Sequence, residues 1–194
     1  IRVYYCNQYG FVSDGKPVVP EYIDSTHCME SYYKPDIRFP IYVGIDWGLT
    51  PAATFGQCLP NGRWIIFDEL VTEDIGATKF AELLGKRIRS DYPGFTFDMW
   101  ADPAGDHRSE TNDEETCFRI VNNRGLHVRP TDTNDPTIRR EAVAVPLTRL
   151  IDGKPGLMIT PKCEVLRKGL AGGYCYKRVQ VSGSERYHDK PNKN

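Results

Sequence analysis

The sequence lacks several patterns that would assign it at once to a familiar class of protein. It has no apolar run long enough to cross a bilayer and no signal-peptide pattern at its start. Its six cysteines stand at wide spacings with no Cys-x-x-Cys pair, which argues against a zinc ribbon or a compact disulfide framework. We therefore expect a cytoplasmic protein with reduced thiols and no membrane partner.

Two further absences concern nucleotides and nucleic acids. No Gly-x-x-x-x-Gly-Lys-[Ser/Thr] sequence is present, so hydrolysis of ATP by a P-loop is not expected of this chain. The formal net charge is only −1, so the molecule lacks the overall positive charge of a protein that coats nucleic acid. Any contact with DNA must come from a local basic patch.

The composition is that of a globular protein. Hydrophobic residues make up 40% and charged residues 26% of 194 residues, which is enough to bury a core in one domain. Residues 1–40 are rich in Tyr and Pro, and prolines interrupt any regular element there. We expect residues 1–40 to form an extended connector arm that lies on a domain of residues 41–194.

From residue 41 onward, strand patterns alternate with helical ones. Residues 41–46, 52–59 and 63–70 predict an antiparallel meander of three strands. Apolar residues at helical spacing predict a helix over 76–90, followed by a fourth strand over 95–101. Because a helix connects them, the fourth strand should run parallel to the first.

The second half continues in the same way. We expect a helix over 114–123, a fifth strand over 126–129 and a helix from Asp135 to 151 that is kinked or divided at Pro146. A strand over 157–160, a helical turn over 163–170 and the first arm of a hairpin over 174–181 should follow. The fold class is α/β, with a mixed central sheet of an antiparallel meander plus parallel strands, flanked by helices.

Two acidic residues stand where parallel strands end. Asp46 closes the first strand and Asp102 closes the fourth, so their backbones should lie about 4.8 Å apart at one edge of the sheet. Carboxylate oxygens suit Mg²⁺, and two divalent ions can together neutralise a phosphodiester and activate water. The alternative is that each aspartate merely caps a turn.

Six segments of the chain form an ordered series: residues 15–18, 44–53, 100–105, 134–135, 140–143 and 151–156. This series resembles the C-terminal nuclease domain of tailed-phage or prophage terminase large subunits. The resemblance implies a ribonuclease H-like sheet in which Asp46 and Asp102 hold Mg²⁺ or Mn²⁺ for catalysis. It further implies cleavage of concatemeric double-stranded DNA during viral DNA packaging in the host cytoplasm.

The resemblance also implies parts that this chain does not contain. A terminase ATPase domain would precede Ile1 in the same polypeptide, and a small terminase subunit and a portal protein would be partners. The family's third metal ligand is an Asp that follows a Pro-x-Lys-Asn segment, and here that segment is residues 191–194. The third acid is therefore expected beyond Asn194, which would make residues 41–194 a nuclease domain truncated at its C-terminus.

Other residues could assist the two aspartates. Glu69 or Glu73, near the end of the third strand, could contribute a carboxylate, although a surface position is the alternative. Asp106, His107 and Arg108 follow Asp102 closely in a loop at the same edge and are further candidates, and His107 or Arg108 could contact phosphate or water. Basic residues near Tyr174 and Tyr176 could position DNA through its phosphates or form an ordinary solvated face; they are Lys162, Arg167, Lys168, Lys177 and Arg178.

Two other functions remain open. Residues 46–50 also resemble the phosphate-binding hairpin of an actin-like or sugar-kinase ATP-binding lobe, but 194 residues leave little room for the second lobe of such a protein. Alternatively, the chain is a non-catalytic docking module of the packaging motor, with its carboxylates serving as turn caps.

Overall fold

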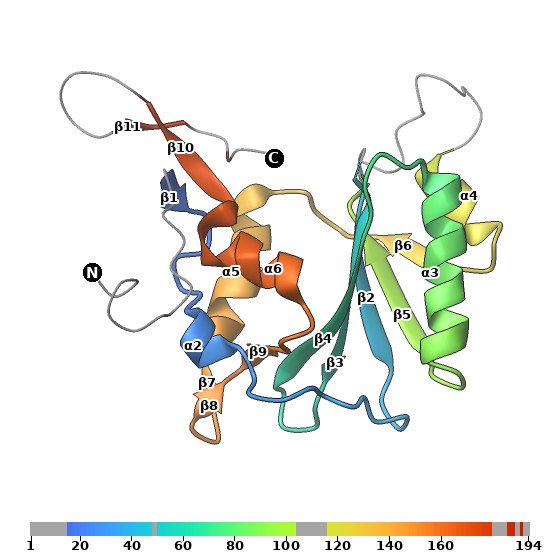
Figure 1. The fold of residues 1–194 in the computed structure, drawn as a ribbon, viewed down its shortest axis with the longest axis horizontal. Helices are drawn as coiled ribbons and strands as arrows, with labels where there is room; N and C mark the ends of the chain where they lie inside the picture. Colours follow the sequence, from blue (N-terminus) through green and yellow to red (C-terminus); the bar gives the residue numbers. More distant parts are fainter. Residues whose placement is uncertain (1–14, 48–49, 104–115, 180–185, 189–190, 192–194) are drawn as a thin grey trace.

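A mixed sheet of six strands forms the centre of the computed structural model, which describes residues 15–47, 50–103, 116–179, 186–188 and 191. The strand order is β6-β5-β2-β3-β4-β9. Helices α3 (Ala77–Asp91) and α4 (Cys117–Asn122) cover one face, and α5 (Pro136–Thr148) and α6 (Glu164–Lys168) lie on the other side (Figure 1). The expected α/β class is confirmed.

The first half of the sheet is the predicted meander. Strands β2 (Ile41–Asp46), β3 (Ala52–Cys58) and β4 (Trp64–Val71) pair antiparallel in sequence order. After α3, strand β5 (Phe97–Ala101) pairs parallel with β2, as the connecting helix predicts. Strand β6 (Val128–Pro130) then pairs parallel with β5 at the edge of the sheet.

The predicted end of the next helix is wrong. Helix α5 ends at Thr148 and is not divided at Pro146, and Leu150–Ile151 forms strand β7 instead. Pro146 stands in the last turn, where its missing N–H removes only one helical bond. Asp152 and Gly153 have φ of 49° and 73°, which suits a tight turn that pairs β7 with β8 (Lys154–Pro155).

Apart from the edge strand β9, the remaining described residues form a second layer beside the sheet. Strand β9 (Leu157–Ile159) pairs parallel with β4, and α6 continues into a π-helical segment over Gly169–Gly173. Strand β10 (Cys175–Val179) pairs antiparallel with β11 (Arg186–Tyr187), as predicted for a hairpin. The described part of the arm adds β1 (Gly15–Pro17), paired with β10, and the one-turn helix α2 (Asp24–His27).

Buried side chains form two cores, one on each face of the sheet. The helix-side core lies under α3 and α4 and includes Ile41, Phe55 and Leu84. The arm-side core joins Val18, Val19 and Tyr22 to α5 and β9, with residues such as Leu147 and Ile159. Alternation along β4 serves both cores, because Ile65 belongs to the first and Trp64 and Ile66 pack against the second.

A β-bulge interrupts this alternation in β4. Phe55 pairs with Asp68 and its neighbour Gly56 pairs with Ile66, so Phe67 is the extra residue. Phe67 and Asp68 consequently both face α3, where Asp68 accepts hydrogen bonds from Arg87 and Tyr92. Glu69 therefore faces the other side, toward α6.

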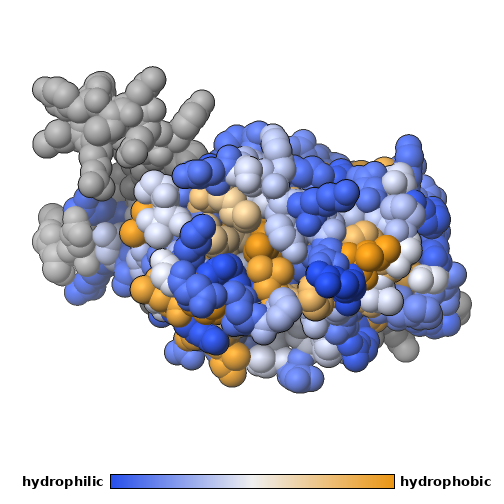
Figure 2. Space-filling view, turned by 90° about the horizontal axis from the view of Figure 1, so that it is seen from below, coloured by the Kyte–Doolittle hydropathy of each residue, from blue (hydrophilic) through white to orange (hydrophobic). Residues whose placement is uncertain are grey.

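The surface has no single dominant apolar area on the face that Figure 2 displays, where hydrophobic side chains form separate groups amid hydrophilic ones. The five cysteines that the structure describes are free thiols. The longest helix of the described ranges, α3, has 15 residues, and none of their helices has the length and apolar character that a bilayer crossing requires.

Candidate metal centre

Asp46 and Asp102 lie side by side at one edge of the sheet. Ile45 pairs with Ala101 in the parallel ladder, and the Asp102 N–H donates to the Ile45 carbonyl at 3.3 Å. The two aspartates are thus the next residues of neighbouring strands, with backbones about 4.8 Å apart. The predicted meeting of these two acids at one rim of the sheet is found.

Their side chains also share a face. Ile45 and Ala101 are buried in the helix-side core, so the residue that follows each of them points to the opposite face. Asp46 is exposed, whereas the Asp102 side chain is only 12% exposed. The pair therefore opens toward the side of the sheet on which α5 lies, away from α3 and α4.

Arg139 of helix α5 contacts Asp102 at this site. Arg139 Nη1 lies 3.2 Å from Asp102 Oδ2 and donates to Asn134 Oδ1 at 2.6 Å. Tyr174, which precedes β10, lies within electrostatic reach of Arg139 and Asp46. Burial raises the pKa of Tyr174, the charge of Arg139 lowers that pKa and the charge of Asp46 raises it. Residues from both layers thus converge on one edge.

The two carboxylates suit a hard divalent cation. Both supply oxygen, the donor that Mg²⁺ prefers, and Mg²⁺ commonly takes one or two carboxylates and keeps several waters. Within residues 15–47, 50–103 and 116–179, no third His, Cys, Asp or Glu joins them in a cluster. Asp46 and Asp102 are therefore the two carboxylates that the described part of the chain places together at this site.

The other acidic candidates lie apart from this pair. Glu69 is on β4, two strands from β2, as the meander predicts, and its two carboxylate oxygens accept the N–H groups of Val165 and Leu166 at the start of α6. Glu73 is exposed in the connection that follows β4. Asp106, His107 and Arg108 lie outside the described residues.

The five basic candidates lie at two places, around α6 and on β10. Three belong to ion pairs: Lys162 with buried Asp68 at 2.8 Å, Arg167 with Asp24 at 2.7 Å and Lys168 with Glu164 at 3.9 Å. The first two of these pairs join different elements of the fold. Lys177 and Arg178 are exposed on β10, the strand that follows Tyr174.

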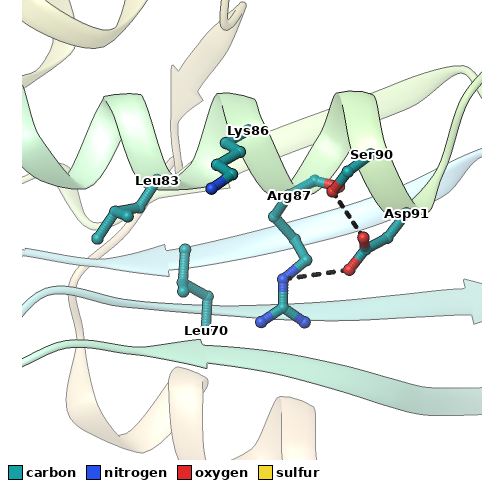
Figure 3. Close-up of a pocket in the computed structure, with 6 residues that line it drawn as sticks. All are labelled: Leu70, Leu83, Lys86, Arg87, Ser90 and Asp91. Atoms are coloured by element: carbon teal, nitrogen blue, oxygen red, sulfur yellow. Dashed lines mark hydrogen bonds and ion pairs between the residues drawn. The ribbon is translucent and has the colours of Figure 1, made fainter.

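A groove of about 350 Å³ lies elsewhere, between α3 and the end of β4. Figure 3 shows Leu70 and Leu83 at one part of its wall and the pair of Arg87 with Asp91, whose atoms are 3.4 Å apart, at another. Lys86 and Ser90 complete the lining. None of these six residues was predicted to act in the site, and the two aspartates are not among them.

The sheet order, the meander and the parallel strands that follow it define a ribonuclease H-like α/β fold. No protein-family model matches the sequence, and no curated protein matches it significantly. Solved structures do share the fold. The nuclease domain of the P22 large terminase superposes with a TM-score of 0.63 at 9% identity, over 85% of this chain and 82% of that one.

Two other phage proteins give the same result. The large terminase nuclease of thermophilic phage G20c, solved with bound magnesium, has a TM-score of 0.56 at 12% identity, over 89% of this chain and 87% of that one. The large terminase of another thermophilic bacteriophage, solved in complex with ADP, has a TM-score of 0.63 at 17% identity, over 94% of this chain. The chain spans only 42% of that ADP-bound protein. The expected ribonuclease H-like fold is confirmed.

The sequence analysis did not place Arg139, Asn134 or Tyr174 at the metal site. A signal for the first two was available, because Asp135 and Pro136 mark a helix start directly after β6, a strand parallel to β5. Parallel strands end at the same edge, so a helix that begins there starts near Asp102. Tyr174 offered no comparable signal, because its position depends on how the second layer packs.

Proposed function

We propose that this chain is a divalent-metal-dependent endonuclease domain of a phage DNA-packaging terminase, which cuts concatemeric double-stranded DNA. The observation that carries the proposal is the pairing of Asp46 and Asp102 at one sheet edge, on a common face. The fold shared with the P22 large terminase nuclease domain supports it, as do the G20c nuclease structures solved with bound magnesium and with bound cobalt.

Asp46 and Asp102 would hold Mg²⁺ or Mn²⁺, with two ions the arrangement we favour. A divalent ion bound there neutralises charge on a scissile phosphate and lowers the pKa of water. Asp46 is exposed and would leave the site open to a duplex, whereas the Asp102 side chain is mostly covered. Lys177 and Arg178 would contact phosphates and position the duplex without reading its sequence.

The wider setting belongs to the same proposal. The ADP-bound relative is called a large terminase and also has a structure with ATP-gamma-S, and this chain corresponds to 42% of the length of the ADP-bound protein. We infer that an ATPase domain accompanies this chain in one polypeptide, that residues 1–40 connect the two, and that a small terminase subunit and a portal protein are partners. The host cytoplasm is the compartment this implies.

Cleavage of supercoiled plasmid tests the proposed function. With Mg²⁺ or Mn²⁺ the protein should nick the plasmid, and Asp46→Asn or Asp102→Asn should each lower the rate by about a hundredfold or more, because each removes a charged metal ligand. Asp98→Asn is the matched control. Asp98 is on β5, the strand that ends just before Asp102, and its side chain faces the same side of the sheet, but it pairs with Arg129.

Four results would contradict this function. Full activity in either aspartate variant would show that Asp46 and Asp102 do not form a required metal site. Nicking that survives a chelator would show that the reaction needs no divalent ion. Tight binding of labelled ATP without nicking would favour the ATP-binding lobe, and the absence of both activities would favour the docking module.

A further inference from the structure

Arg139 joins the two layers of the molecule through the same carboxylate that is proposed to bind metal. Its Nη1 atom lies 3.2 Å from Asp102 Oδ2. This contact joins α5, a helix of the second layer, to the end of β5, a central strand. The same Nη1 atom donates to Asn134 Oδ1 at 2.6 Å. One guanidinium nitrogen therefore has two acceptors, one charged and one neutral.

The backbone around Arg139 is fixed, so its side chain is the part that can move. The Asp135 carboxylate accepts the N–H groups of Thr137 and Ile138, and Pro136 sets the first turn of α5. The preceding loop is tied to the sheet because the Thr131 N–H donates to the Ala101 carbonyl at 3.0 Å. The Arg139 side chain itself is 52% exposed.

We propose that Arg139 is a positioning residue that competes with the divalent ion for Asp102 and turns toward the DNA backbone when the ion binds. This inference rests on the proposed nuclease function. Two cations beside one carboxylate repel each other, so binding of the ion at Asp102 disfavours the Arg139 contact. Asn134 keeps one hydrogen bond to the guanidinium, and the remaining N–H groups can then donate to phosphate oxygens.

This competition couples metal affinity and DNA affinity in opposite directions. Removing the Arg139 charge should strengthen binding of the ion, because the ion no longer displaces a guanidinium from Asp102. The same change should weaken binding of DNA, because a phosphate contact is lost. A purely structural arginine would weaken both, so the opposite signs distinguish the two roles.

The neighbouring Arg140 supplies a matched control. It is on the same turn of α5 but pairs with Glu21 of the arm at 2.9 Å. Arg140→Gln removes an equal charge one residue away without touching Asp102. Arg139→Lys keeps the charge while losing the planar fork, so it should retain most of the competition with metal.

Calorimetric titration of the protein with Mn²⁺ tests the proposal. Arg139→Gln should lower the dissociation constant for Mn²⁺ by about fivefold, while Arg140→Gln and Arg139→Lys should leave that constant near the wild-type value. In plasmid nicking at saturating Mn²⁺, Arg139→Gln should raise the KM for DNA by roughly fivefold, and Arg140→Gln should not.

The possible failures are distinguishable. If the wild type binds Mn²⁺, Asp102→Asn does not, and Arg139→Gln binds Mn²⁺ no more tightly than the wild type, the competition is refuted and the nuclease proposal stands. If the wild type itself binds no Mn²⁺ at millimolar concentration, the proposed function fails, and this inference fails with it.

Discussion

At the scale of single residues, Asp68 is a buried carboxylate with partners from several elements of the fold. Its carboxylate is 1% exposed and accepts from Arg87, Tyr92, Lys162 and the N–H of Glu69. Burial raises the pKa of Asp68, but the hydrogen bonds from Lys162 and Tyr92 and the charges of Arg87 and Lys162 outweigh burial and hold that pKa below its ordinary value. The ionised form therefore stabilises the fold.

Asp68→Asn should lower the free energy of unfolding by about 3 kcal/mol at pH 7, because it leaves Arg87 and Lys162 without their shared anion. A carboxylate with a depressed pKa stabilises the fold above its unfolded pKa of about 4 and stops doing so as pH falls through its folded pKa. The difference between the two proteins should thus shrink below about pH 4.

Urea unfolding at pH 7 and between pH 5 and 3 measures this difference. Glu82→Gln is the control, since Glu82 forms an exposed pair with Lys79 at 3.0 Å and should change stability little at any pH. A difference for Asp68→Asn that stays constant down to pH 3 would show that the carboxylate is not the titrating group.

Among the elements, α5 begins at a capping residue, Asp135, whose side chain accepts two backbone N–H groups. Asp135→Ala should cost about 1 kcal/mol of stability, because the N–H groups of Thr137 and Ile138 lose their side-chain acceptor. Asp135→Ser should recover most of that loss, since serine is an equally good cap. Equilibrium unfolding in urea compares the three proteins, and equal losses for alanine and serine would assign the effect to something other than capping.

The elements also show where a sequence alone is informative. Strands β2, β3 and β4 could be placed because alternation, length and the turn before Arg63 agree locally. The end of α5 could not, because it depends on the pairing of β7 with β8 and on the Gly156 N–H, which donates to the Arg149 carbonyl at 2.7 Å. Those partners follow the helix in sequence and give no signal within it.

At the scale of the whole molecule, the two cores share strand β4 as a common wall. Leu84→Ala in the helix-side core and Leu147→Ala in the arm-side core should each lower the free energy of unfolding by about 2 to 5 kcal/mol. Because one sheet carries both cores, each variant should unfold in a single transition with an unchanged dependence on urea. Far-ultraviolet circular dichroism and tryptophan fluorescence should give coincident curves, and a separate transition in either variant would mean that the cores fold independently.

The site follows the same division between local and distant information. Asp46 and Asp102 could be paired from the sequence because a single crossover helix makes their strands parallel neighbours. The contact of Arg139 with Asp102 could not, although the residues are only 37 positions apart, because it needs the placement of α5 against the sheet. The roles of all three residues in binding metal and DNA remain predictions.

The bulge in β4 makes the sheet tolerant of a change in length at one position. Losing Phe67 would remove a buried ring, but Ile66, Asp68 and Glu69 would keep their present sides, because a regular strand of the shortened sequence alternates in the same phase. Losing Glu69 would instead turn Leu70 away from the helix-side core and Val71 toward it. Related chains that are one residue shorter in this strand should therefore have their gap at the bulge, at Phe67 or Asp68.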